Sequence, residues 1–172
     1  MKITPTVDDR KLQQKIDQQI REQPRQIQTA LGRTAEFLLQ DIKRRTQAGK
    51  DSKNNVFQGY STTPYFFNIG SKANPVYKTF QGGYKEFRQF KGRQNNKVDL
   101  NFSGQMLSNM TQKSTPKQAT LFFSNVFQAK KAIGNQKKRE FFAIGNRQKQ
   151  IINFFAKEFK KVNKLIWVKE RT

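Results

Sequence analysis

The chain lacks the side chains that most often carry out nucleophilic, metal or near-neutral proton chemistry, since it has no His and no Cys. Its 12 acidic residues are scattered, apart from Asp8 and Asp9, which are placed to cap a helix. No paired-carboxylate motif is present, and neither a Ser–His nor a Cys–His set can form. A lysine nucleophile is the one catalytic group that the sequence leaves open. We therefore predict a protein that is not an enzyme and needs no cofactor or metal.

Charge is the strongest feature of the composition. The chain has 34 Lys and Arg against 12 Asp and Glu, a net of +22 over 172 residues, and residues 101–172 hold 15 of these cations against 3 acids. A chain this basic repels itself unless it contacts negative charge or distributes its own charge over an assembly. The charge therefore predicts a protein that assembles with others or contacts a polyanion.

The apolar content is low but sufficient for one core. Hydrophobic residues make up 34% of the chain, and 16 of them are Phe, each of which buries a large area. We predict a single domain over residues 1–172. No stretch approaches the ~20 apolar residues of a membrane span, and residues 1–9 lack the apolar run of a signal peptide, so no membrane contact is expected.

Apolar spacing predicts helices at both ends of the chain. The first covers residues 7–23 as an N-terminal extension, and Pro24 then either kinks it or begins a second helix. The pattern continues to Gln47 and stops at Gly49. The last helix covers residues 147–168.

The middle of the chain reads as a long loop or arm over residues 49–97, with a short helix at Gly83–Phe90 left open. A short helix over residues 103–110, with Ser103 as its N-cap, and a strand over residues 118–124 follow. Residues 126–132 read as a second strand or an irregular connection. The expected class is α+β, with long N-terminal and C-terminal helices packed on a small, mostly antiparallel sheet.

Three basic clusters are the candidates for facing DNA or an acidic partner. Clustered cations release counterions from phosphates, although a solvated helix face explains a lysine stripe equally simply. The candidates are Lys43, Arg44, Arg45, Lys137, Lys138, Arg139, Lys157, Lys160, Lys161 and Lys164.

Aromatic residues of the loop form the second candidate set. Tyr60, Tyr65, Phe66 and Phe67 are predicted to anchor contacts between subunits or to pack in the core. Stacking on single-stranded bases is the alternative for such rings.

Three segments together carry a family resemblance. The first is the helix end Ile42-Lys43-Arg44-Arg45-Thr46-Gln47-Ala48-Gly49-Lys50-Asp51, followed by Tyr60 and Tyr65. The second is Val98-Asp99-Leu100-Asn101-Phe102-Ser103-Gly104-Gln105-Met106-Leu107, and the third is Arg139-Glu140-Phe141-Phe142-Ala143-Ile144 before the last helix. Their order resembles that of tailed-bacteriophage virion-morphogenesis proteins of the tail-completion, or head–tail joining, type.

The resemblance covers about residues 35–165, and it implies a subunit of a ring in the phage neck. Such a ring, a hexamer or dodecamer, would join the portal and adaptor of the head to the tail proteins, with genomic DNA in its channel as a further candidate partner. The implied location is the virion neck, after assembly in the host cytoplasm. Three features depart from the family pattern. The loop between Tyr65 and Val98 is long, Ala143 stands where the family often has glycine, and the N-terminal helix over residues 7–23 is an addition.

Two rival functions stay open at this stage. A non-specific nucleic-acid-binding protein of another assembly, such as a packaging or ribosome-associated factor, fits the same charge. An enzyme of unfamiliar type is the third reading.

Overall fold

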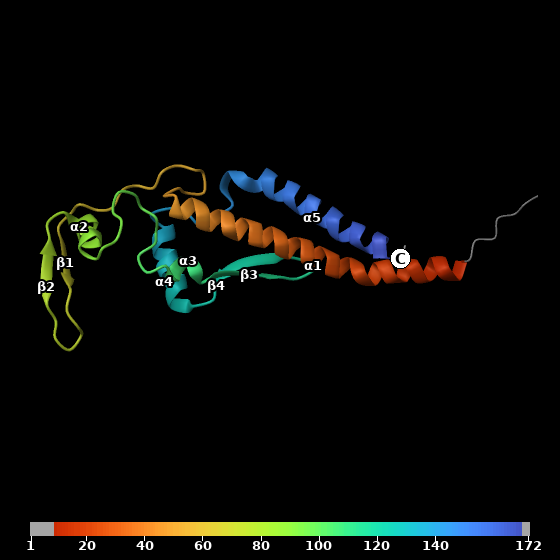
Figure 1. The fold of residues 1–172 in the computed structure, drawn as a ribbon, viewed down its shortest axis with the longest axis horizontal. Coiled ribbons are helices and arrows are strands. Elements are labelled where there is room, and N and C mark those ends of the chain that lie inside the picture. Colours follow the sequence, from red (N-terminus) through yellow and green to blue (C-terminus); the bar gives the residue numbers. More distant parts are fainter. Residues whose placement is uncertain (1–8, 170–172) are drawn as a thin grey trace, which may run out of the picture. The chain divides into compact units, whose positions relative to one another are not determined.

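Figure 1 shows the computed structural model, which describes residues 9–169. Side chains are described from Arg10 to Asn163, except those of Lys11, Leu12, Lys15, Ile16 and Gln19. In chain order the elements are α1 (Asp9–Gln47), β1 (Tyr65–Asn68), β2 (Tyr77–Phe80), α2 (Gly83–Phe90), α3 (Gln105–Ser108), β3 (Met110–Ser114), β4 (Ala119–Phe123), α4 (Val126–Gln136), the 3₁₀ turn η1 (Gly145–Arg147) and α5 (Gln148–Lys169). Helices and two small antiparallel sheets confirm the predicted α+β class.

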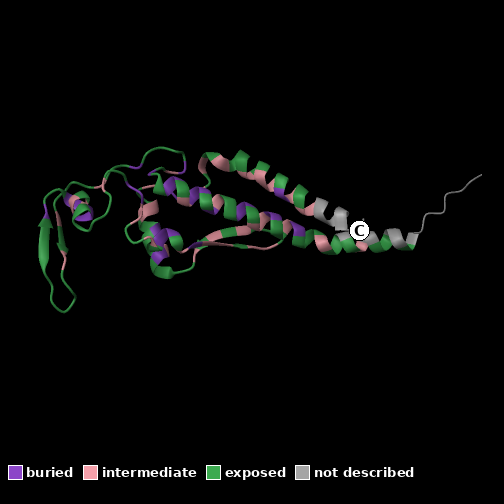
Figure 2. Ribbon diagram, viewed as in Figure 1, coloured by how far each residue is buried: buried purple, intermediate pink, exposed green. Residues whose placement is uncertain are grey.

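The first helix, α1, is continuous through Pro24, so this proline does not begin a second helix. Figure 2 shows buried positions recurring along α1, as the apolar spacing requires. The helix ends at Gln47, and Gly49 follows with φ +81°, which confirms the predicted stop because a left-handed residue ends a helix at little cost when it is glycine. The predicted start of this helix at Val7 lies outside the described residues.

The described residues form two compact units. The helical unit consists of residues 9–37, 112–121 and 149–169, and the network unit consists of residues 38–111 and 122–148. Helix α1 and the β3–β4 hairpin contribute residues to both units.

In the helical unit, α5 lies alongside the middle of α1 and not its first turns (Figure 1). The rings of Phe37 and Phe154 stack with centroids 4.4 Å apart, and Arg33 forms an ion pair with Glu158 at 3.0 Å. The tip of the β3–β4 hairpin approaches α1 closely because Gly32 has no side chain, and a Cβ there would lie 3.0 Å from Ser114 Oγ. These contacts join α5 and the β3–β4 hairpin to α1.

In the network unit, the β1–β2 hairpin covers one side of α2 with aromatic rings. The strands pair antiparallel with Tyr65 opposite Phe80, so both rings lie on the same face of the hairpin. Phe87 of α2 is 4% exposed, and its centroid lies 4.8 Å from that of Phe67 and 5.3 Å from that of Phe80. The short helix considered possible at Gly83–Phe90 is therefore confirmed as α2. It lies within residues 49–97, which were predicted to be mainly a long loop.

The segment after residue 100 differs from the sequence-based expectation in three places. The helix predicted over residues 103–110 is a single turn, α3, whose N-cap is Gly104 instead of Ser103. The chain then enters β3, a strand that was not predicted. Met110, at the start of this strand, is buried. The predicted strand over residues 118–124 is confirmed as β4.

Residues 126–132 are helical, so the prediction of a strand or irregular connection there was wrong. Val126 and Phe127 favour a strand by propensity. The Asn125 side chain accepts hydrogen bonds from the backbone N–H groups of Phe127 and Gln128, which caps the first turn of α4 and outweighs that propensity. The predicted last helix is confirmed as α5.

Candidate functional site

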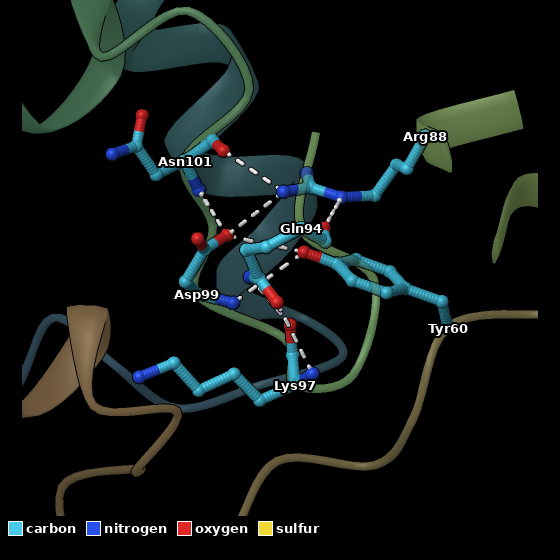
Figure 3. Close-up of polar contacts among 6 residues, drawn as sticks. All are labelled: Tyr60, Arg88, Gln94, Lys97, Asp99 and Asn101. Atoms are coloured by element: carbon cyan, nitrogen blue, oxygen red, sulfur yellow. Dashed lines mark hydrogen bonds and ion pairs between the residues drawn. The ribbon is translucent and has the colours of Figure 1, made fainter. Parts of the chain in front are cut away.

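A buried ion pair lies at the centre of the network unit (Figure 3). Arg88, in the last turn of α2, is 2% exposed, and its Nη2 lies 3.3 Å from Asp99 Oδ1. The same nitrogen donates to the carbonyl of Asn101 at 3.1 Å, and Arg88 Nε donates to the carbonyl of Gln94 at 2.8 Å. These bonds compensate the guanidinium for its loss of water, which a buried charge requires.

Tyr60 completes this cluster from the other side. Its hydroxyl donates to Asp99 Oδ1 at 3.1 Å, and its ring centroid lies 4.5 Å from Arg88 Cζ (Figure 3). Burial raises the pKa of Tyr60 to about 12, so the phenol stays protonated and remains a donor at neutral pH. We call Tyr60, Arg88, Asp99 and Asn101 the arginine cluster. It holds the backbone of residues 94–101 against α2.

A recess beside the arginine cluster is the candidate site. It has a volume of about 570 Å³. Its lining comes from the loop after α1, the α2 region, the α3 segment and α4. Cationic side chains in the lining are Arg88, Lys131, Lys138 and Arg139, and none of the described lining residues is acidic. We call this recess the basic groove.

Aromatic rings form much of the remaining wall of the basic groove. Tyr60, Tyr65, Tyr84 and Phe102 line it. Tyr84 meets the rings of Tyr60 and Tyr65 edge-on, at centroid distances of 5.6 and 5.8 Å. Such edge-to-face contacts stabilise a rigid wall.

Two buried polar atoms beside the groove have no hydrogen-bond partner among the described residues. One is Oε1 of Gln128, a residue 8% exposed on α4 whose amide nitrogen donates to Gln105 Oε1 at 3.4 Å. The other is Nε of Arg139, whose Nη2 donates to the carbonyl of Gln58 at 3.2 Å. Because buried polar groups are nearly always paired, these two atoms require water or a ligand.

A second polar cluster joins the end of α1 to the segment before α5. Arg45 is 4% exposed, pairs with Asp41 at 3.3 Å, and donates to the carbonyls of Phe141 (2.8 Å) and Ala143. Burial lowers the pKa of the Arg45 guanidinium, and the nearby Asp41 carboxylate opposes this shift. Arg45 is therefore a structural cation in the described structure, and its predicted exposure to DNA or a partner is incorrect.

The other predicted cations lie in both units. In the network unit, Arg44 is exposed and pairs with Asp41 at 3.0 Å, Lys43 is half-buried, and Lys137 is exposed. Lys138 and Arg139 line the basic groove, which brings two predicted residues together.

In the helical unit, Lys157, Lys160 and Lys161 are exposed on α5. Lys161 contacts Glu158 at 2.6 Å, and this bond, followed by the bond from Arg33, lowers the pKa of the Glu158 carboxyl. The side chain of Lys164 lies outside the described part of the structure. The predicted cations are thus divided between the two units.

The four predicted aromatic contacts separate into two kinds. Tyr60 belongs to the arginine cluster, and Tyr65 is half-buried against Phe67 and Phe87. Phe67 is 38% exposed and packs on Phe87, whereas Phe66 is 65% exposed on the opposite face of the hairpin. Only Phe66 presents most of its surface outward.

Sequence reasoning did not identify four residues that shape the groove, namely Arg88, Asp99, Gln128 and Lys131. Asp99 was noticed only as part of a motif. The sequence shows only that Arg88 and Asp99 have opposite charges and lie near a loop. Many residues that form no ion pair have the same two properties. Lys131 was missed because residues 126–132, now part of α4, were predicted to be a strand or an irregular connection.

Other kinds of site are not found within the described residues. No group of three or more His, Cys, Asp or Glu there could hold a metal ion. No helix of the described part is long and apolar enough to cross a membrane. Comparison of the chain with protein-family models, with curated proteins and with solved structures finds no match.

Proposed function

We propose that this protein is a structural subunit of a tailed-phage neck, forming a ring that joins the head to the tail around the DNA channel. It would act by assembly and not by catalysis, in contact with the portal or adaptor on one side and tail proteins on the other. The proposal rests on the resemblance carried by three sequence segments, together with the surfaces described below.

The observation that carries the proposal is that these three segments pack on one another in the network unit. Arg45, from the first segment, donates to the carbonyls of Phe141 and Ala143 in the third. Ser52 N donates to Glu140 O at 2.8 Å, just after the first segment.

The second segment meets the first at Gly49. A Cβ at Gly49 would lie 3.0 Å from the carbonyl oxygen of Val98, so only glycine allows this close approach without a shift of the neighbouring backbone. The three segments are far apart in sequence, and residues in each of them are therefore needed for the contacts that hold the segments together. This supports the view that the resemblance reflects a common fold of this region.

An exposed aromatic surface supports assembly through the β1–β2 hairpin. Phe66 and Tyr77 are 65% and 59% exposed, and their rings stack at 5.0 Å on the face of the hairpin turned away from α2. Val76, the residue before Tyr77, is 54% exposed. Contiguous exposed apolar side chains mark protein contacts more often than isolated ones do. We assign this hairpin face to the contact with the next subunit.

The proposal is tested by measuring oligomeric state and particle incorporation. Native mass spectrometry of the purified protein should give a closed oligomer, and purified phage particles should contain the chain. Phe66→Ser with Tyr77→Ser should shift the oligomer toward monomer, whereas the control Val56→Ser, at a position 78% exposed elsewhere in the same unit, should not. A protein that is monomeric in all conditions and missing from particles would refute the proposal.

The alternative is a non-specific nucleic-acid-binding protein, and the exposed lysines of α5 favour it. Lys157 and Lys160 have no ion pair with any described residue, so they are free to contact phosphates. This function requires an affinity for duplex DNA that falls steeply with salt. An affinity that is flat between low and moderate salt would remove it.

A further inference from the structure

We propose that the basic groove binds an extended acidic segment of a neighbouring protein in the assembly. The ligand class is a peptide rich in Asp and Glu, held by Lys131, Lys138 and Arg139. The identity of the neighbour as a neck component rests on the proposed function, whereas the acidic chemistry of the ligand rests on the groove alone.

The charges available to a ligand come from the rim of the groove. Arg88 is already paired with Asp99 and bonded to two carbonyls, so it offers little further binding capacity. Lys131 and Lys138 are exposed and form no ion pair with any residue that the structure describes. Two free ammonium groups on a recess without acids attract a carboxylate ligand.

The unpartnered buried atoms define polar contacts deeper in the wall. Arg139 Nε is a donor that a carboxylate or a peptide carbonyl would accept from. Gln128 Oε1 is an acceptor, which a peptide N–H satisfies and a nucleic-acid phosphodiester, which has no donor, cannot. A peptide therefore meets both requirements, donating to one atom and accepting from the other.

Three rings of the aromatic wall each already have one occupied face, which reduces the surface available to nucleic-acid bases. Base stacking needs a free ring face. One face of Tyr60 carries the Arg88 guanidinium, Tyr65 is stacked on Phe67, and Phe102 is stacked on Phe87. Duplex DNA is also disfavoured, because its phosphates lie on a convex surface that meets an exposed lysine array more readily than a recess.

The experiment measures binding of an oligoglutamate peptide of about six residues, which spans roughly 20 Å when extended. Titration by calorimetry, with amide chemical shifts followed by NMR, should show saturable binding that moves the amides around Gln128 and Arg139. The double variant K131A/K138A should weaken this binding by roughly tenfold, as expected for the loss of two charge contacts.

The matched control removes the same charge elsewhere. K157A/K160A, on α5 of the helical unit, should change the peptide affinity by less than about twofold, since neither lysine lines the groove and exposed charges are screened by salt. Q128L, which preserves the net charge, should also weaken peptide binding, by roughly threefold for one neutral hydrogen bond. Circular dichroism of each variant verifies that it is folded.

Three results would overturn the proposal. If K131A/K138A and K157A/K160A weaken peptide binding equally, the effect is due to net charge and not to the groove. If the binding of a single-stranded oligothymidine depends more strongly on Lys131 and Lys138 than the binding of the peptide does, the groove is a nucleic-acid site. Unchanged shifts at Gln128 and Arg139 would leave water as the partner of the two buried atoms. Ring formation is measured separately, so the failure of one proposal does not imply failure of the other.

Discussion

The helical unit and the network unit are stabilised in different ways. In the helical unit, α1 and α5 meet through the Phe37–Phe154 stack and through the pair of Glu158 with Arg33, whose side chain is 50% exposed. In the network unit, Arg88 and Asp99 form an ion pair that is almost fully enclosed. Periodic apolar spacing is enough to build the first unit, whereas the second depends on individual residues that must find specific partners.

The largest expected difference between the units concerns aromatic packing. Phe87→Ala should lower the free energy of unfolding of the network unit by about 4 kcal/mol, because it removes a buried ring and leaves a cavity. Phe37→Ala removes a ring that is 37% exposed and should cost only about 1–2 kcal/mol.

Denaturant titration can follow the two units separately. All four Tyr lie in the network unit, at positions 60, 65, 77 and 84, and the sole Trp, Trp167, lies in the sequence of α5. Tyrosine and tryptophan emission should therefore report different transitions. Equal losses of stability for Phe87→Ala and Phe37→Ala would contradict the contrast between the units.

The second prediction concerns the arginine cluster. Asp99→Ala leaves the Arg88 guanidinium buried without its carboxylate, and it should destabilise the network unit by about 3 kcal/mol. Glu158→Ala breaks the Arg33 pair in the helical unit and should have a much smaller effect, because Arg33 is free to return to water. Urea titration of both variants measures the difference, and a loss at Asp99 no greater than that at Glu158 would show that burial of the pair is unimportant.

The third prediction uses the high pKa of Tyr60. The folded pKa, about 12, lies above the ordinary value of 10.0, so the protonated phenol favours the folded state. Its contribution is complete below pH 10 and is lost as the pH rises toward 12. Ultraviolet titration of tyrosinate should show one of the four tyrosines ionising late, and Tyr60→Phe should remove that late step. Four ordinary titrations in the unaltered protein would contradict the burial of this hydroxyl.

The smallest effect is expected for Glu158. Its folded pKa lies below the ordinary value of 4.5, because Lys161 and Arg33 stabilise the carboxylate. The stabilisation is present above pH 4.5 and is lost as the pH falls through the folded pKa. Thermal unfolding of the helical unit between pH 6 and pH 3, followed by Trp167 emission, should show a slightly steeper acid loss than in Glu158→Gln. Identical pH profiles would mean that this pair adds nothing to stability.

Part of the fold could be predicted because it depends on local signals. The heptad-like spacing of α1 and α5, the stop at Gly49 and the β-prone run of β4 were each visible in a short stretch of sequence. Helix α4 was missed because two competing local signals were present. The Asn125 cap outweighed the strand propensity of Val126 and Phe127, and only the backbone geometry shows which of them prevails.

The candidate site was less predictable for the same physical reason. Sequence proximity placed Arg45 with Lys43 and Arg44, yet its guanidinium is buried against carbonyls about 96 positions further along the chain. Lys138 and Arg139 were predicted to face DNA or an acidic partner, and they share a groove with Lys131, which was not predicted, while Lys157 and Lys160 belong to another unit. Whether a cationic side chain is buried or faces solvent cannot be predicted from its neighbours in sequence.

Composition and periodicity alone determined the positive charge, the long terminal helices and the α+β class, because these depend on residue counts and on spacing within one element. Tertiary structure alone decided which cations are buried and which are free, since a buried ion pair such as Arg88–Asp99 forms only when the chain encloses it. A buried charge needs a partner at close range, and that requirement divides structural cations from those left to bind another molecule.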